Sequence, residues 1–95
     1  MKGYKIMNQN ALHFITITTV GWIDVFARKE YREVLLESMH HCVANKHLVV
    51  YAYVIMSNHM HVIWQAPHGN LSNILRDFKK FTAHAIIQLI QKSNF

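Results

Sequence analysis

Apolar residues recur along the chain with two different periods, and the change of period divides the chain into strands and helices. Residues 11–20 (ALHFITITTV) are rich in β-branched and aromatic side chains, which is typical of a strand. From about residue 27 to residue 46, apolar positions fall three and four apart, which predicts an amphipathic helix. The stripe of this helix consists of Tyr31, Val34, Leu35, Met39, Cys42 and Val43.

Two further strands and a second helix continue the pattern. Residues 48–56 (LVVYAYVIM) are almost continuously apolar, which favours a central strand buried on both faces. Ser57-Asn58 predicts a two-residue turn, because asparagine tolerates positive φ, and residues 59–66 then return antiparallel. Asn70 is expected to cap a helix over residues 71–91. The apolar stripe of that helix is Leu71, Ile74, Leu75, Phe78, Thr82, Ala85, Ile86, Leu89 and Ile90.

The predicted order is therefore β-α-β-β-α, in a single domain that spans residues 1–95. This order predicts an α+β fold, a ferredoxin-like α/β plait that lacks its final strand, with an antiparallel sheet and both helices on one face. Such a sheet has an open edge, which is a liability for a monomer. We expect a second copy of the chain to pair with this edge in a homodimer; the alternative is that Met1–Met7 supplies the extra strand.

The charge balance is basic, with ten Lys and Arg against five Asp and Glu and a formal charge of +5. This balance favours a polyanionic partner such as nucleic acid, although a soluble protein that is basic and has no such partner would show the same charge balance.

The single cysteine, Cys42, fits a reducing compartment, and its place on the helix stripe predicts a buried structural thiol. No signal peptide precedes the domain and no apolar run is long enough to span a bilayer, so we expect a cytoplasmic protein without a membrane partner.

The residues most suited to chemistry are His59, Met60 and His61. Side chains two apart on a strand point to the same face, so both imidazoles are available to one divalent ion while Met60 turns to the core. A His-x-His pair alone is a weak signal, because many such pairs are ordinary exposed strand residues. Two ligands are also too few for most metal sites, so other groups must complete the shell.

The surrounding sequence resembles a known family. Tyr51–Ile63 (YAYVIMSNHMHVI) is similar to the HUH segment of the single-tyrosine transposases, the IS-two-hundred-like group and its REP-associated relatives. HUH denotes His, a bulky hydrophobic residue and His, which are His59, Met60 and His61 here. Ser57 stands where the family commonly has proline, a mild departure because serine also suits a turn. The similarity extends over Leu12–Thr19, Asp24-Val25-Phe26 and Asn70–Ala85, and so over nearly the whole chain from about Ala11.

The resemblance implies a DNA transposase of the HUH type, in which His59 and His61 bind Mg²⁺ or Mn²⁺. In that family the ion polarises the scissile phosphate of single-stranded or hairpin DNA, and a tyrosine attacks to give a 5′-phosphotyrosine link and strand transfer. The nucleophilic tyrosine lies on a helix after the fourth strand. None of the four tyrosines here occupies that place, since Tyr4, Tyr31, Tyr51 and Tyr53 all come earlier. We therefore expect the chain to be inactive in cleavage on its own, either as a decayed copy or as a fragment of a longer enzyme.

Several other residues are candidates for nucleic-acid contact or for the core. Arg76, Lys79 and Lys80 lie off the apolar stripe of the second helix and are predicted to contact the DNA backbone, with a solvated helix face as the alternative. Trp22, Phe26 and Trp64 are candidates to stack on unpaired bases, although the strand parity of Trp64 favours the core. Tyr31, Tyr51 and Tyr53 are expected in or near the core.

Two other functions remain compatible with the sequence. A plait with basic and aromatic residues can serve as a non-enzymatic nucleic-acid-binding module, although no paired aromatic motif on adjacent strands is evident. A transposase remnant that acts through mixed dimers with an intact relative is the other alternative.

Overall fold

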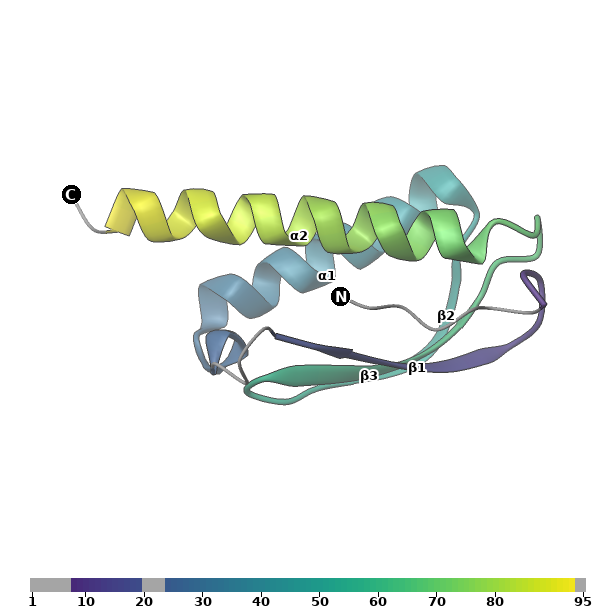
Figure 1. The fold of residues 1–95 in the computed structure, drawn as a ribbon, viewed down its shortest axis with the longest axis horizontal. Helices are drawn as coiled ribbons and strands as arrows, with labels where there is room; N and C mark the ends of the chain where they lie inside the picture. The colour runs from purple at the N-terminus through teal and green to yellow at the C-terminus, as the bar shows by residue number, and fades with distance from the viewer. Residues whose placement is uncertain (1–7, 20–23, 94–95) are drawn as a thin grey trace.

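The computed structural model describes residues 8–19 and 24–93, which fold as two long helices over a three-stranded sheet (Figure 1). The elements are β1 (His13–Thr18), the 3₁₀ helix η2 (Val25–Ala27), α1 (Lys29–Lys46), β2 (Val49–Ile55), β3 (His59–Gln65) and α2 (Leu71–Ser93). The predicted β-α-β-β-α order is confirmed, and the ends of the elements lie within a few residues of the predicted ones.

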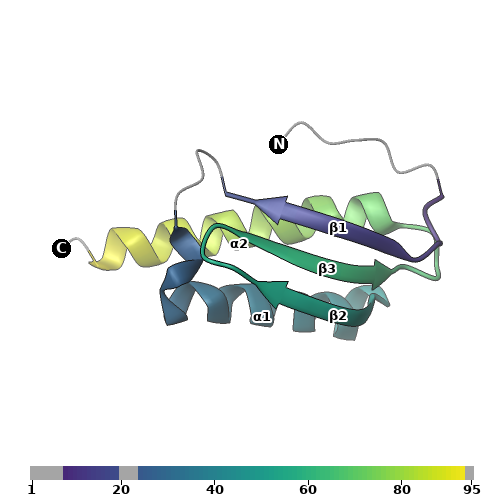
Figure 2. The same cartoon turned by 90° about the horizontal axis from the view of Figure 1, so that it is seen from below.

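The strands form one antiparallel sheet in the order β1-β3-β2. Both helices cover the same face; in Figure 2 the sheet lies nearest the viewer and the helices lie behind it. The α+β class, the antiparallel sheet and the helices on one face are confirmed, and the described residues have the arrangement of a plait without its fourth strand. The strand that Met1–Met7 was expected to supply in the alternative fold lies outside the described residues.

The prediction that residues 48–56 form a central strand buried on both faces is wrong. β2 lies at the edge of the sheet, and Tyr51, Tyr53 and Val54 are each about half exposed. The central strand is β3, in which buried and half-exposed residues alternate. Helices cover only one face of this sheet, so even the central strand is buried on one face only. A continuous apolar run therefore does not specify the place of a strand in the sheet.

The core lies between the helices and the covered face of the sheet. At its centre the rings of Trp64 and Phe78 meet edge to face, with centroids 5.2 Å apart and an interplanar angle of 84°. Trp64 is 0% exposed and Phe78 is 1% exposed, so the prediction of a core role for Trp64 is confirmed. Other buried residues are Ile15, Ile17, Leu35, Met39, Met60, Val62, Leu71 and Ile74.

The predicted burial of Cys42 and Tyr31 is confirmed, whereas that of two other tyrosines is not. Burial in the core raises the pKa of the Cys42 thiol above its usual value, which makes this thiol a poor nucleophile. Tyr53 faces the helices but is exposed because β2 is an edge strand that they cover incompletely, whereas the Tyr51 hydroxyl reaches Gln65 on the open face of the sheet. The apolar and aromatic composition of β2 thus predicts a strand, but it does not predict which of its side chains are buried.

The turn after β2 lies at Ser57-Asn58 as predicted, but neither this turn nor the end of α1 has the expected backbone conformation. α1 ends at His47, which adopts a left-handed conformation with φ of 60°, and the Leu48 N–H donates to the Cys42 carbonyl at 3.3 Å. This pattern is a standard helix C-cap. Positive φ was predicted at Asn58, but among the described non-glycine residues only His47 has it. The turn at Ser57-Asn58 is instead closed by a local hydrogen bond from the Met56 N–H to the His59 carbonyl at 2.7 Å, and tertiary hydrogen bonds to Ser57 and Asn58 add to it.

The first turn of α2 is capped by Gln9 and not by Asn70. Gln9 Oε1 accepts a hydrogen bond from the Ser72 N–H at 2.8 Å, and Gln9 Nε2 donates to Ser72 Oγ at 2.8 Å. Asn70 Oδ1 is buried and accepts no hydrogen bond from the described residues. The predicted Asn70 cap is therefore wrong, because a side chain 63 positions away in the sequence satisfies the exposed amide at the helix start.

Replacement of Gln9 by alanine should lower the free energy of unfolding by about 1 kcal/mol, since it removes this cap. Urea denaturation of wild type and Gln9→Ala measures the change. Gln88→Ala, which removes an exposed glutamine from the same helix, is the matched control and should unfold as wild type does. Equal effects of the two substitutions would show that the Gln9 contacts do not stabilise α2.

One ion pair joins the two helices. Lys46 Nζ of α1 lies 3.1 Å from Asp77 Oδ2 of α2, and Arg76 Nε lies 3.5 Å from Asp77 Oδ1. The hydrogen bond from Lys46 is the main cause that lowers the pKa of the Asp77 carboxyl, and attraction to both cations adds to it. The charged form of Asp77 is thus favoured in the folded protein.

This lowered pKa gives a pH-dependent difference between wild type and Asp77→Asn. The contribution of the carboxylate is fully present above the pKa of Asp in the unfolded chain, about 4, and is lost as the pH falls through the lower folded pKa. Wild type should therefore melt at a slightly higher temperature than Asp77→Asn at pH 6, and the two melting temperatures should converge towards pH 2. A difference in melting temperature that stays constant between pH 6 and pH 2 would show that the substitution acts through packing and not through the charge of Asp77.

Candidate metal centre and nucleic-acid interface

His59 and His61 project from the central strand onto the face of the sheet that the helices leave open. Met60 lies between them with 0% exposure and packs in the core, so alternation along β3 places both imidazoles on the opposite face. The two rings meet edge to face, with centroids 4.9 Å apart and an interplanar angle of 79°. Two nitrogen donors are thereby held close together at one end of β3.

One nitrogen of each imidazole is engaged by a neighbouring side chain. Nδ1 of His59 lies 2.7 Å from Asn58 Oδ1, and Nδ1 of His61 lies 3.0 Å from Thr16 Oγ1. No described residue forms a hydrogen bond with Nε2 of either ring. When Nδ1 donates to these oxygens, Nε2 carries a free lone pair. This is the arrangement in which metal-binding histidines are usually held.

The turn that leads into the histidine pair is fixed from the segment between β1 and α1. The Thr19 N–H and hydroxyl both donate to the Asn58 carbonyl, at 3.0 and 3.2 Å, and the Phe26 N–H donates to the Ser57 carbonyl at 2.8 Å. Ser57 Oγ also donates to Asp24 Oδ1 at 3.0 Å. These four contacts set the position of Asn58, and with it the orientation of His59.

The pair offers only two of the ligands that a metal ion would need. The described part of the chain contains no group of three His, Cys, Asp or Glu side chains that could hold a metal ion. Gln65 shares the face of the pair but lies four residues beyond His61, about 13 Å along the strand. His13 pairs with Trp64, at the end of β1 away from the pair. The two imidazoles suit a divalent ion, and oxygen ligands from elsewhere must complete its shell.

A match to a family model covers almost the whole chain: the IS200-like transposase model aligns with residues 7–94, a span that includes the histidine pair. The chain belongs to the IS200-like transposase family. The resemblance seen in the sequence around His59 and His61 is thus confirmed at the level of the family. No curated protein and no solved structure matches the chain.

In this transposase-family chain, the three basic residues predicted to contact DNA lie on the helical layer, behind the sheet that carries the histidine pair. Arg76 and Lys80 are exposed. Lys79 is half-buried and lines an apolar hollow with Ile17 and Ile86, and this burial lowers the pKa of its ammonium group. The structure therefore separates Lys79 from the other two by its burial, and it places all three on the helical layer and not on the open face that carries the histidine pair. Their role in DNA contact stays a prediction.

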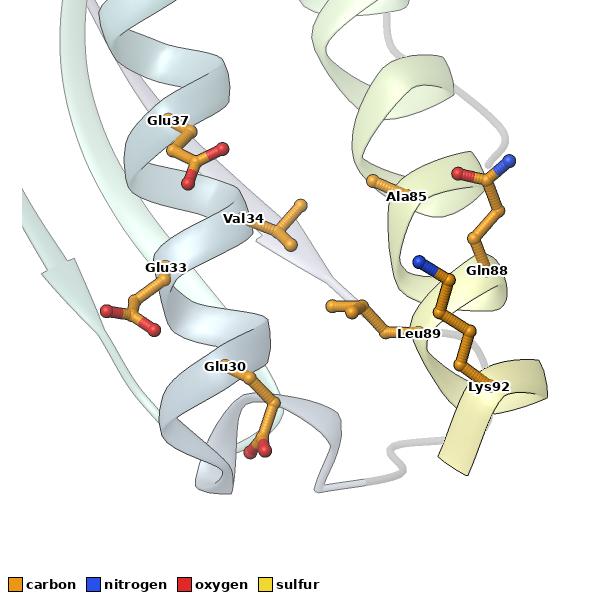
Figure 3. Close-up of a pocket in the computed structure, with 8 residues that line it drawn as sticks. All are labelled: Glu30, Glu33, Val34, Glu37, Ala85, Gln88, Leu89 and Lys92. Carbon is orange, nitrogen blue, oxygen red and sulfur yellow. The ribbon is translucent and has the colours of Figure 1, made fainter. Parts of the chain in front are cut away.

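The helical layer also contains an acidic groove. Glu30, Glu33 and Glu37 line it from α1, while Gln88 and Lys92 line it from α2. Val34 and Leu89 point toward one another across its floor (Figure 3). Figure 3 shows that the Glu33 carboxylate points away from α2, but the acidic residues of α1 still repel a polyanion, so this groove is poorly suited to nucleic acid.

Aromatic residues on the open face of the sheet were missed by the sequence analysis. Phe14 of β1 is 68% exposed and its ring centroid lies 5.8 Å from that of His61. The alternation of β1 already places Phe14, Thr16 and Thr18 on one face, but the strand order was needed to show that this strand lies beside β3.

Two residues that were predicted to stack on bases have different outcomes. Phe26 is buried and so unsuited to stacking, and Trp22 lies outside the described residues.

Neither α1 nor α2, the two helices long enough to be considered, is apolar enough to cross a bilayer.

Proposed function

We propose that this chain binds single-stranded or hairpin DNA on the open face of its sheet and holds a divalent ion, Mg²⁺ or Mn²⁺, at His59 and His61 for transposase strand cleavage. The observation that carries the proposal is the pair of imidazoles with Nδ1 engaged by Asn58 and Thr16 and Nε2 without a partner among the described residues. Membership of the IS200-like transposase family supports DNA as the substrate.

The described residues would supply position and charge rather than the nucleophile. His59 and His61 would hold the ion at the end of β3, and the bonds to Asn58 and Thr16 would keep both rings oriented for it. When bound, the ion would neutralise charge on the scissile phosphate and orient that phosphate for attack.

No described tyrosine is placed to attack such a phosphate. Tyr31 is buried, and Tyr53 pairs with Val62, whose side chain lies on the helix-covered face. The Tyr51 hydroxyl donates to Gln65 Oε1 at 2.7 Å, far along the strand from the histidine pair. We therefore expect no covalent protein–DNA adduct when this 95-residue chain is incubated with a labelled hairpin and Mn²⁺. A labelled band that survives denaturing electrophoresis would contradict this expectation.

Binding of a stem-loop DNA with and without Mn²⁺ tests the proposal directly. Wild type should bind more tightly with Mn²⁺, and the double variant His59→Ala, His61→Ala should lose this difference while it remains folded. His40→Ala, His41→Ala removes two exposed histidines from α1 and is the matched control. Identical Mn²⁺ responses of the wild type and the double variant would refute a metal role for the pair.

A non-enzymatic nucleic-acid-binding module is the second candidate, because exposed aromatic residues lie on the sheet face, as they do in RNA-binding plaits. Affinity for RNA that is equal with and without Mn²⁺ would favour this second function.

For either function we expect a homodimer, since β1 and β2 both have an open edge in the described sheet. Light scattering measures the mass of the assembly.

A further inference from the structure

The open face of the sheet carries large apolar side chains next to the histidine pair. Phe14 is 68% exposed, Tyr51 is 58% exposed, and Ile63 lies between their strands on β3. Single exposed apolar residues are common on protein surfaces, but a contiguous group on one face of a small domain indicates a binding surface. The chemistry of the histidine pair does not account for this group.

The strand register fixes how this group lies relative to the histidines. Phe14 is opposite Ile63, and Thr16 is opposite His61, so the two rows are one two-residue step apart, about 6–7 Å. The Phe14 ring already contacts the His61 ring, with centroids 5.8 Å apart and an interplanar angle of 44°. A phosphate at the histidine pair would thus have its neighbouring nucleotide over Phe14.

Tyr51 is held in place by hydrogen bonds on the other side of β3. The register between β2 and β3 shifts at this point, between Val50 and Ala52. The Tyr51 hydroxyl donates to Gln65 Oε1 at 2.7 Å, and Gln65 Nε2 donates to the Asn10 carbonyl at 3.2 Å. These hydrogen bonds hold the Tyr51 ring in place without a ligand. Binding therefore costs less side-chain conformational entropy at this residue.

The electrostatics of this face suit a nucleic acid. None of the three strands contains an Asp or Glu residue, whereas Glu30, Glu33 and Glu37 lie on α1 in the other layer. A polyanion laid along the sheet would meet aromatic rings, hydroxyl groups and imidazoles without acidic side chains from the strands. Unpaired bases stack on aromatic rings with little dependence on sequence, because every base has a π face.

We propose that Phe14, with Ile63 and Tyr51, forms a stacking subsite for the unpaired base next to the phosphate held at His59 and His61. This inference rests on the proposed function, since it takes the histidine pair as the phosphate position. It assigns Phe14 to substrate binding and makes no claim about a chemical step.

The test uses single-stranded oligonucleotides in which one abasic site is moved along the sequence, with affinity measured by fluorescence anisotropy. For wild type, one position should cost about tenfold in affinity when its base is absent. Phe14→Ala should bind the intact oligonucleotide about tenfold more weakly and should be insensitive to the abasic site at that position. Phe14→Trp should restore both properties. Phe81→Ala removes a phenylalanine that is 54% exposed on α2 and should behave as wild type.

The outcomes separate this inference from the proposed function. If Phe14→Ala keeps the wild-type response at every abasic position, while the double histidine variant loses its response to Mn²⁺, the subsite is refuted and the proposed function stands. If wild type binds neither single-stranded nor stem-loop DNA with or without Mn²⁺, the proposed function fails and the subsite with it. If Phe14→Ala instead lowers the mass of a dimer in light scattering without altering the abasic response, a second copy covers this face, and the subsite is again refuted.

Discussion

Trp64→Ala is expected to lower the free energy of unfolding by about 3–5 kcal/mol, the largest loss of stability that we predict for a single substitution in this chain. Trp64 is 0% exposed and meets Phe78 edge to face, so its removal leaves a cavity between the sheet and α2. Small domains have total stabilities of about 5–15 kcal/mol, and a chain of this size lies toward the lower end. We therefore expect Trp64→Ala to be largely unfolded at 37 °C.

Trp64→Phe is the matched control for this prediction. Trp64 Nε1 is buried and has no hydrogen-bond partner among the described residues. The desolvation of this N–H therefore offsets part of the free energy that burial of the ring contributes to stability. Phenylalanine removes that donor and retains most of the apolar volume. Urea denaturation should show a much smaller loss for Trp64→Phe than for Trp64→Ala. Similar losses for both would mean that the shape of the indole, rather than the volume it fills, stabilises the core.

The fold was predictable from the sequence where a local pattern decided the structure. The periodicity of α1 and α2 and the alternation in β1 and β3 each reflect which side of an element meets the core, and these elements formed as predicted. The place of β2 was not predictable in this way. An apolar run reports that a strand avoids water, but the order β1-β3-β2 depends on pairings between distant segments.

The same division applies to the candidate site. The spacing of His59 and His61 was enough to place both on one face, because alternation is a local property of a strand. Their partners were not predictable, since Thr16 reaches His61 across 45 positions and Gln9 reaches Ser72 across 63. The separation of Arg76, Lys79 and Lys80 from the histidine pair likewise follows from the layering of helices behind the sheet.

Thr16→Val is expected to raise the Mn²⁺ concentration needed for half-maximal enhancement of DNA binding by about 10–100-fold, although Thr16 itself would not touch the metal. The substitution keeps the shape of the side chain and removes the hydroxyl that lies 3.0 Å from His61 Nδ1. Without that partner, His61 can rotate and can place its proton on Nε2, which then cannot coordinate an ion.

Thr18→Val separates this effect from a general change in β1. Thr18 lies on the same strand and the same face, opposite His59, and no described residue forms a side-chain hydrogen bond with it. A titration of stem-loop DNA binding against Mn²⁺ should therefore show a shifted midpoint for Thr16→Val and a wild-type midpoint for Thr18→Val. An equal shift in both variants would mean that the β-strand surface, and not the orientation of His61, governs the response to Mn²⁺. No shift in either would show that His61 is oriented by groups other than Thr16.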